Sequence, residues 1–328
     1  MVTNASILQA FLDAGPEVHL SGESLAEKLG VSRVAVHARI KKLEQSGIHF
    51  QATPRKGYQL VDEPEQLHQD LLSAYVSQDK VNLESVEVLP STDSTNLEVE
   101  RRLANNAPTP FAVLAHQQTQ GRGRLGRAWQ SSHAGNLYMS IGFRPETPTT
   151  AIAPFSLWAG VHIANALRKL LDIPLQVKWP NDLHVEGKKV AGILCEAKLE
   201  LARVQTLVFG FGLNVNQDAA SFPEGLRTPA NSLKTILGKP APIHSVTTSV
   251  LKAVLRAYED CQLPEAGMAL KNAFGLVDAL NNKAVEVQSG TQTMSGVANG
   301  IDENGNLLVV TEETTVAVSA GDVTLKPL

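Results

Sequence analysis

The stretch SRVAVHARIKKLEQSGIHFQATPRKGYQLV, residues 32–61, decides the fold of the N-terminal part of the chain. Ser32 is a typical N-cap residue, and Val36, Ile40 and Leu43 recur at helical spacing, so an amphipathic helix is predicted there. The residues after this helix predict two short strands around a Pro-Arg-Lys-Gly turn. A helix followed by a basic hairpin is the second half of a winged helix-turn-helix.

Two shorter helices are predicted before this stretch. The first carries its apolar residues on one face and ends at a Gly-Pro pair, and the second ends at Gly30. Their apolar positions are Ile7, Leu8, Phe11 and Leu12, then Leu25, Ala26 and Leu29. Residues 1–63 therefore predict a complete winged helix-turn-helix domain.

The third helix and the hairpin are rich in basic residues. In this fold the third helix enters the major groove of DNA, while basic side chains neutralise phosphates. The predicted DNA contacts are Ser32, Arg33, His37, Lys41, Arg55 and Lys56. The alternative is a small helical domain that docks on another protein or only dimerises, because the fold alone does not determine the function.

Composition limits the function of the whole chain of 328 residues. Its 29 Lys and Arg residues against 33 Asp and Glu residues give a net charge of -4, which excludes a general polyanion binder. Cys195 and Cys261 form neither a CxxC motif nor a Cys/His cluster, so no metal site and no disulfide framework is predicted. Without an apolar leader or membrane span, we expect a cytoplasmic protein with no membrane partner.

Three further regions follow the winged helix. Residues 64–80 are polar and predict a linker, partly a short helix with Leu71, Leu72 and Tyr75. Residues 81–273 mix strands, such as FAVLA (111–115) and LYMSIGF (137–143), with the apolar helix FSLWAGVHIANALRKLL (155–171). Residues 274–328 alternate short strands with Gly and Asn turns, which predicts a small β-barrel. The fold class is therefore an α+β multidomain protein.

The motif GRGRLGR, residues 121–127, lies between the two strands named above and suggests an anion-binding loop. Glycines let the backbone approach a ligand closely, and arginines give bidentate donors to carboxylates or phosphates. The alternative is a solvated basic loop. The motif is not a Walker A loop, because no Gly-Lys-Ser/Thr ends it.

Four other segments carry polar or basic groups beside predicted strands. DSTN (93–96) suits hydrogen bonding to a small polar head group, although this motif taken alone favours an ordinary Asx or Ser/Thr helix cap. KWPNDL (178–183) and GKKVAGILCE (187–196) bring lysines and a carboxylate together in sequence, and GFGLNVN (210–216) ends a strand with small residues and amides.

In this order, the motifs DSTN, QTxGRGRxGRxW, KWPND, KxAGIL and GxGxN resemble those of biotin protein ligases. With the winged helix in front, the chain resembles over its whole length the bacterial bifunctional biotin ligase and biotin operon repressor. The resemblance implies a class II synthetase-like catalytic domain at 81–273 and an SH3-like barrel at 274–328.

The resemblance also implies a reaction and its partners. Biotin's carboxylate attacks the α-phosphate of ATP, and the biotinyl-5′-adenylate then acylates a lysine of the biotin carboxyl carrier protein of acetyl-CoA carboxylase. Two anions must meet, so cations are needed around the phosphorus, and Mg²⁺ is expected with ATP. The adenylate-bound homodimer is expected to bind operator DNA and repress biotin-synthesis genes.

By resemblance, Arg124 stabilises phosphate charge and Lys189 contacts the carboxylate and the α-phosphate. Asp182 orients Mg²⁺ or the incoming lysine amine, or it forms a structural ion pair with Lys178. The other implied positions are Ser94, Thr95, Asn96 and Gln118 at the head group, Gly121, Arg122 and Gly123 in the loop over biotin, Trp129 as an apolar wall, Lys178 in the substrate site, Gly192 and Gly212 for close backbone approach, and Asn214 on the nucleotide side.

Leu125 and the segment 216–232 need separate comment in this resemblance. Leu125 stands where many members have a fourth arginine, so no essential phosphate contact is expected there. Residues 216–232 occupy the position of a loop that orders over the adenylate in repressing members, and whether its only aromatic residue, Phe222, caps adenine stays open. The rival functions are a lipoate-type acyl-adenylate ligase, a transcription factor that only senses biotin, and a ligase whose winged helix does not bind DNA.

Overall fold

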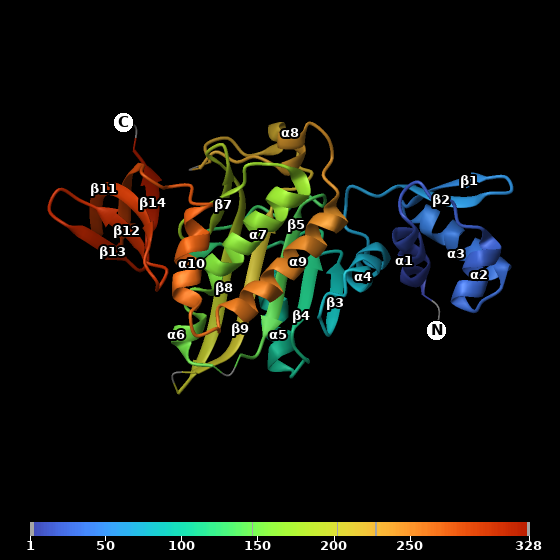
Figure 1. Cartoon of the computed structure of the whole chain (residues 1–328), viewed down its shortest axis with the longest axis horizontal. Helices are drawn as coiled ribbons and strands as arrows, with labels where there is room; N and C mark the ends of the chain where they lie inside the picture. Colours follow the sequence, from blue (N-terminus) through green and yellow to red (C-terminus); the bar gives the residue numbers. More distant parts are fainter. Residues whose placement is uncertain (1–2, 146, 202, 227, 327–328) are drawn as a thin grey trace.

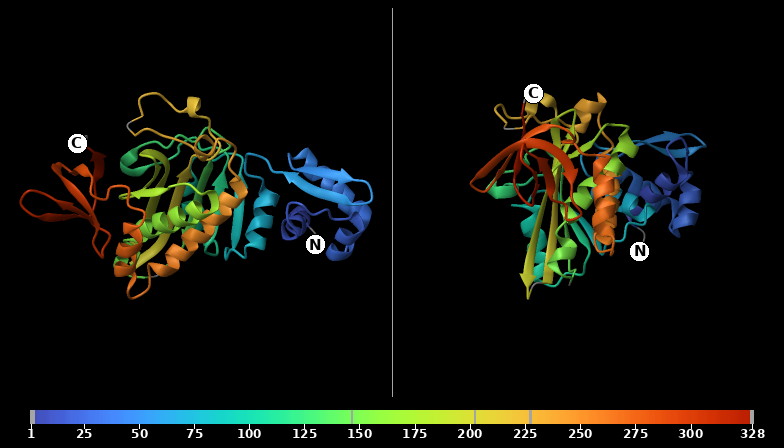
Figure 2. Two further views of the ribbon diagram at one scale, coloured as in Figure 1. Left: turned by 45° about the horizontal axis from the view of Figure 1, so that its top comes forward. Right: turned by 60° about the vertical axis from the view of Figure 1, so that its left-hand side comes forward.

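The computed structural model of the chain describes residues 3–145, 147–201, 203–226 and 228–326. Residues 1–2 and 327–328, which the sequence predictions include in the first and last domains, and Arg227 of the predicted loop lie outside the described residues. Three parts follow one another along the long axis of the molecule (Figures 1 and 2). A helical domain with a hairpin occupies one end, a large sheet lies in the middle, and a small β domain occupies the other end.

The N-terminal domain is the predicted winged helix-turn-helix. It contains helices α1 (Asn4–Ala14), α2 (Gly22–Leu29) and α3 (Arg33–Gln45), followed by the antiparallel pair β1 (His49–Thr53) and β2 (Gly57–Asp62). Ser32 is the N-cap of α3, where its Oγ accepts a hydrogen bond from the Ala35 amide at 3.2 Å. Val36, Ile40 and Leu43 are buried as their spacing predicts.

Helix α4 (Gln69–Gln78) lies between the N-terminal domain and the central domain. Leu71 and Leu72 are both fully buried, but Leu71 packs in the winged-helix core and Leu72 in the central core. Two hydrogen bonds reinforce the junction: the His68 amide donates to His244 Nε2 at 2.9 Å, and Tyr75 Oη donates to Glu63 at 2.6 Å. The predicted short helix therefore belongs to two hydrophobic cores at once.

The central domain is built on a seven-stranded sheet in the order β3-β4-β5-β9-β8-β7-β6. Among the described strands of this sheet, the β3–β4 pair is parallel and the other pairs are antiparallel. The strands are β3 (Ser85–Leu89), β4 (Phe111–Ala115), β5 (Leu137–Phe143), β6 (Gln176–Lys178), β7 (Asp182–Val185), β8 (Lys188–Glu200) and β9 (Arg203–Leu213).

Both faces of the sheet are covered, which explains why β4 is apolar at every position. Phe111 and Val113 pack with α5 (Thr95–Ala104), whereas Ala112 and Leu114 join the main core on the other face. Helices α7 (Phe155–Leu171) and α9 (Ile243–Asp260) lie side by side over that second face (Figure 1). The remaining helical segments are α6 (Thr149–Ile152), α8 (Leu233–Leu237), α10 (Ala266–Gly275) and the 3-10 turns Arg124–Gly126 and Ala219–Ser221.

The C-terminal domain is a five-stranded antiparallel sheet in the order β13-β12-β11-β10-β14. Its apolar residues, for example Val285 and Val309, belong to the same core as the central domain. The strands are β10 (Ala284–Ser289), β11 (Gln292–Ile301), β12 (Leu307–Val310), β13 (Thr315–Val318) and β14 (Asp322–Leu325). The predicted α+β multidomain class is confirmed, and no helix of the described residues is long and apolar enough to cross a membrane.

Candidate active site

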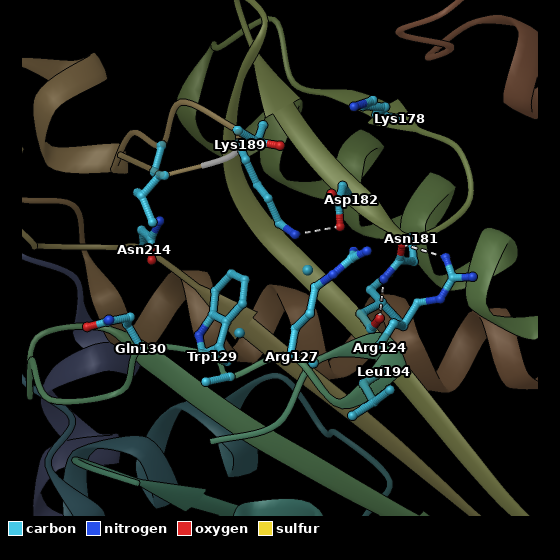
Figure 3. A pocket seen from close by; sticks show the side chains of 18 of the residues that line it. Arg124, Arg127, Trp129, Gln130, Lys178, Asn181, Asp182, Lys189, Leu194 and Asn214 are labelled. Carbon is cyan, nitrogen blue, oxygen red and sulfur yellow. Dashed lines mark hydrogen bonds and ion pairs between the residues drawn. The ribbon is translucent and has the colours of Figure 1, made fainter. Parts of the chain in front are cut away.

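One cavity of about 490 Å³ brings together segments from the central and C-terminal domains. Its walls are the start of α5, the 122–130 loop, the segment 178–181, strands β7 to β9, residues of the segment 217–230 and strand β14. Figure 3 shows part of this lining. Every substrate-site residue named from the sequence lines this cavity except Gly121. Those residues are Ser94, Thr95, Asn96, Gln118, Arg122, Gly123, Arg124, Trp129, Lys178, Asp182, Lys189, Gly192, Gly212 and Asn214.

The start of α5 forms a polar end of the cavity. Ser94 occupies the N-cap position, but its side chain makes no capping hydrogen bond, so the ordinary-cap interpretation of DSTN is wrong for this residue. The Thr95 amide and hydroxyl both donate to Gln118 Oε1, at 2.8 and 3.1 Å. Asn96 donates from Nδ2 to Glu196 at 2.6 Å and accepts from Ser140 at 2.6 Å.

Gly192 and Gly212 face each other across the β8–β9 pair and form a floor under the Trp129 indole. A Cβ atom on Gly212 would lie 2.5 Å from Trp129 Cε2, and one on Gly192 would lie 3.2 Å from Trp129 Cζ3. The sequence predicted that these glycines let the backbone approach a ligand closely. In this structure the group that lies close to them is the Trp129 indole. Gly121 has a related role outside the cavity lining, because a Cβ there would lie 2.4 Å from the Trp129 carbonyl oxygen.

Cationic groups gather at the other end of the cavity. Lys189 Nζ lies 2.7 Å from Asp182 Oδ1 and 5.3 Å from the centre of the Trp129 ring. Arg124 Nη1 donates to Asn181 Oδ1 at 3.0 Å, as Figure 3 shows. The sequence suggested Lys178 as the ion-pair partner of Asp182 and did not indicate Lys189. Lys178 lies opposite Asp182 in the pairing of β6 with β7.

Arg127 ties the basic loop to the C-terminal domain. Its guanidinium forms an ion pair with Asp322 at the start of β14, and this carboxylate raises the pKa of Arg127 above its ordinary value. The neighbouring Leu125 is 74% exposed, in line with the expectation that it makes no essential contact. The loop is therefore ordered against two domains, and the solvated-loop alternative does not describe it.

Sequence reasoning missed several polar residues that line the site or contact its lining, among them Ser140, Asn181, Glu196, Arg127 and Asp322. Asn181, Glu196 and Arg127 stand inside motifs that the sequence had singled out, so their position was itself a signal. Ser140 lies in an apolar strand and Asp322 in the last strand, where nothing local marks them.

The DNA-contact residues predicted from the sequence lie on one domain. Ser32, Arg33, His37 and Lys41 are exposed on or beside α3, and Arg55 and Lys56 are exposed at the hairpin turn. His37 Nδ1 lies 2.8 Å from Tyr58 Oη, which connects α3 to the hairpin. Arg39 instead donates to Asn4 on α1 at 3.4 Å, so it faces away from this group.

Known protein families match each of the three domains, and known proteins match the chain over nearly its full length. A family model described as "HTH domain" matches residues 4–59, "Biotin/lipoate A/B protein ligase family" matches 86–214, and "Biotin protein ligase C terminal domain" matches 281–326. The bifunctional ligase/repressor BirA of Bacillus subtilis is 32% identical over 324 residues, covering 97% of each chain. The chain belongs to the BirA family of bifunctional biotin ligase/repressors.

Other BirA-family relatives agree with this assignment. The bifunctional ligase/repressor BirA of Escherichia coli K12 is 33% identical over 95% of this chain and 94% of its own length. The structure of the biotin protein ligase from Aquifex aeolicus in complex with biotin and ATP matches with a TM-score of 0.63 at 30% identity. That match covers 74% of this chain and 99% of the Aquifex chain.

In this BirA-family chain the 216–232 segment is attached to the backbone of Lys189. The Lys189 amide donates to the Pro229 carbonyl at 2.8 Å, and the Asn231 amide donates to the Lys189 carbonyl at 2.9 Å. Asn214 Nδ2 donates to the Asn231 carbonyl at 3.0 Å, while Phe222 lines the cavity. The segment therefore forms the wall nearest Lys189 and Asn214.

His184 adds a neutral group to the BirA-family site. Burial lowers its pKa to about 4, and its Nδ1 donates to the Gly187 carbonyl at 3.2 Å. At neutral pH the positive charge of this wall therefore comes from lysines and arginines. Among the described residues, no cluster of three or more His, Cys, Asp or Glu side chains could hold a metal ion by itself.

Proposed function

We propose that this chain activates biotin with ATP and transfers the biotinyl group to a lysine of the biotin carboxyl carrier protein of acetyl-CoA carboxylase. The observation that carries the proposal is the division of one cavity into a buried polar end and a cationic end, with the indole of Trp129 between the glycine floor and the ligand space. Biotin has a matching division into a polar ureido head, an apolar chain and a carboxylate.

In the first step, a carboxylate oxygen of biotin attacks the α-phosphorus of ATP, and the bond to pyrophosphate breaks. Lys189 has three N–H donors, so it can keep its bond to Asp182 and still donate to the carboxylate and the α-phosphate. Arg124, oriented by Asn181, supplies charge where the phosphate develops it. Fixed cations of this kind offset the repulsion between the two reacting anions.

In the second step, the lysine amine of the carrier protein attacks the acyl carbon of biotinyl-5′-adenylate, loses a proton, and AMP leaves. Ser94, Thr95, Asn96 and Gln118 hold the ureido ring throughout both steps, and Trp129 packs against the apolar part of biotin. Asn214 and the 216–232 segment form the nucleotide side.

Mg²⁺ enters this site with ATP. Since the described residues offer no protein cage for a metal, its ligands would be phosphate oxygens, water and the carboxylate of Asp182, which is a usual way to bind this ion. Bound there, it would neutralise phosphate charge, and Asp182 would exchange part of its contact with Lys189 for the ion.

A second function, repression of biotin-synthesis genes by operator binding, is supported by the exposed basic residues of α3 and the hairpin and by the full-length BirA relatives. We expect the adenylate-bound chain to act as a homodimer, since paired winged helices read two-fold operators. The unpaired thiols of Cys195 and Cys261 suit the reducing cytoplasm in which both activities would take place.

Pyrophosphate exchange with biotin and ATP tests the ligase proposal. Arg124→Ala and Lys189→Ala should each lower the exchange rate about 10²- to 10³-fold, because each removes an oriented cation from the reacting anions. Lys188→Ala is the matched control, because this neighbouring lysine is exposed and does not line the cavity. Near-native exchange in both variants, or exchange supported by lipoate in place of biotin, would contradict the proposal.

A further inference from the structure

Glu196 on β8 connects two parts of the site that are far apart in sequence. Its Oε1 forms an ion pair with Arg122 Nη2 at 3.0 Å, and its Oε2 accepts from Asn96 Nδ2 at 2.6 Å. One carboxylate thus holds the first arginine of the basic loop and a residue at the start of α5.

The contact with Asn96 determines which way its amide group points. With Nδ2 directed at Glu196, the Oδ1 atom accepts from Ser140 Oγ at 2.6 Å, and Ser140 Oγ also lies 2.7 Å from Thr95 Oγ1. Asn96 is only 4% exposed, and a Cβ on Gly210 would lie 2.2 Å from its Oδ1, so the amide has little room to turn. Glu196 is the charged end of this chain of hydrogen bonds.

The contact with Arg122 distinguishes this arginine from the others in the loop. Arg124 is held by Asn181 and Arg127 by Asp322, both toward the cationic end of the cavity. Arg122 is 43% exposed at its side chain, and its charge is matched by Glu196 beside the polar end. An arginine paired in this way positions the loop over a neutral group and leaves the phosphates to the other cations.

We propose that Glu196 is a positioning residue for biotin: it fixes the orientation of the Asn96 amide at the end of the cavity that takes the ureido ring, and it holds the basic loop over that ring through Arg122. The inference rests on the proposed function, because it assumes that the polar end takes the head group of biotin. It predicts that losing Glu196 affects the binding of biotin more than that of ATP.

The test measures kcat and KM for biotin and for ATP by pyrophosphate exchange in the full chain, and biotin binding by calorimetry without ATP. Glu196→Ala should raise the biotin KM and Kd about 10- to 100-fold, because hydrogen bonds to charged groups are lost on two sides. The ATP KM should stay unchanged. Glu196→Gln should cause a smaller rise, since a neutral amide can accept from Asn96 but cannot form the ion pair. Glu200→Gln, near the exposed end of the same strand, is the matched control.

Arg122→Ala separates positioning from a general structural effect. In the Glu196→Ala background it should add little, because the two residues act through one contact. An unchanged biotin KM in the Glu196 variants, an equal rise in the ATP KM, or additive effects of the two substitutions would overturn the inference. If Glu196→Ala does not fold, Glu196→Gln with Arg122→Ala decides by the same criteria. Wild-type chain that does not bind biotin at all would instead remove the proposed function.

Discussion

At the scale of single residues, the site depends on the absence of a side chain at Gly212. The Trp129 indole occupies the space where any side chain of residue 212 would start, with a Cβ separation of 2.5 Å. Backbone atoms of a β-strand cannot move aside easily, because both neighbouring strands hold them. The indole would have to move instead, and with it the wall that the proposal assigns to the apolar part of biotin.

Gly212→Ala should therefore lower kcat/KM for biotin by about 10-fold or more, the range expected for an overpacked site. It should also reduce the change in tryptophan fluorescence when biotin binds, because the Trp129 indole lies directly against Gly212, whereas Trp158 and Trp179 are both buried. Gly275→Ala serves as the control, since a Cβ there has no neighbour within 4 Å. Full activity of the Gly212 variant would show that the indole is not a fixed part of the site.

At the scale of elements, α3 and the hairpin present their basic residues together because Tyr58 and His37 hold them in contact. The arrangement suits phosphate and base contacts on one side of the domain. Arg39 is excluded from it by its bond to α1. We therefore expect each of the six predicted contact residues to contribute to DNA binding, which single substitutions can measure.

Arg33→Ala and Lys41→Ala should weaken binding of the chain to its own biotin-synthesis promoter in the presence of biotin and ATP. If the side chain replaced contacts a phosphate, the slope of log affinity against log salt should fall by about 1. Lys28→Ala on α2, whose side chain pairs with Asp13, is the control. Affinity that does not depend on ligand, or no loss in either variant, would indicate that the domain has another purpose.

Elements were predicted well where local pattern determines them. The apolar runs 111–115 and 137–143 coincide with β4 and β5, because burial on both faces requires continuous apolar sequence. The run 155–171, whose apolar residues recur at helical spacing, coincides with α7. The partners inside the site could not be read in this way. Arg127 meets Asp322 across 195 positions and Thr95 meets Ser140 across 45, and such contacts follow from the tertiary fold alone.

At the scale of the whole molecule, the domains are not independent units. The core of the C-terminal domain continues into the central core, and α4 contributes to both the central and the winged-helix core. Leu71 and Leu72 are adjacent, fully buried and divided between these two cores. They offer a direct measure of how strongly the two cores depend on each other.

Leu71→Ala and Leu72→Ala should each lower the free energy of unfolding by about 2 to 5 kcal/mol. Because both side chains belong to one helix, calorimetry should show the same transition shifted to lower temperature in both variants. Two separate transitions, with Leu71→Ala affecting only one and Leu72→Ala only the other, would contradict the coupling of the domains.

Helix α4 also bears on operator architecture. A winged helix joined by a flexible tether could adjust to half-sites at several separations, because the tether would absorb the difference. Here the connection is a packed helix tied to α9 through His68 and His244. In a dimer, the distance between the two recognition helices would then be determined by how the central domains pair, and inserting or deleting base pairs between the half-sites should abolish binding.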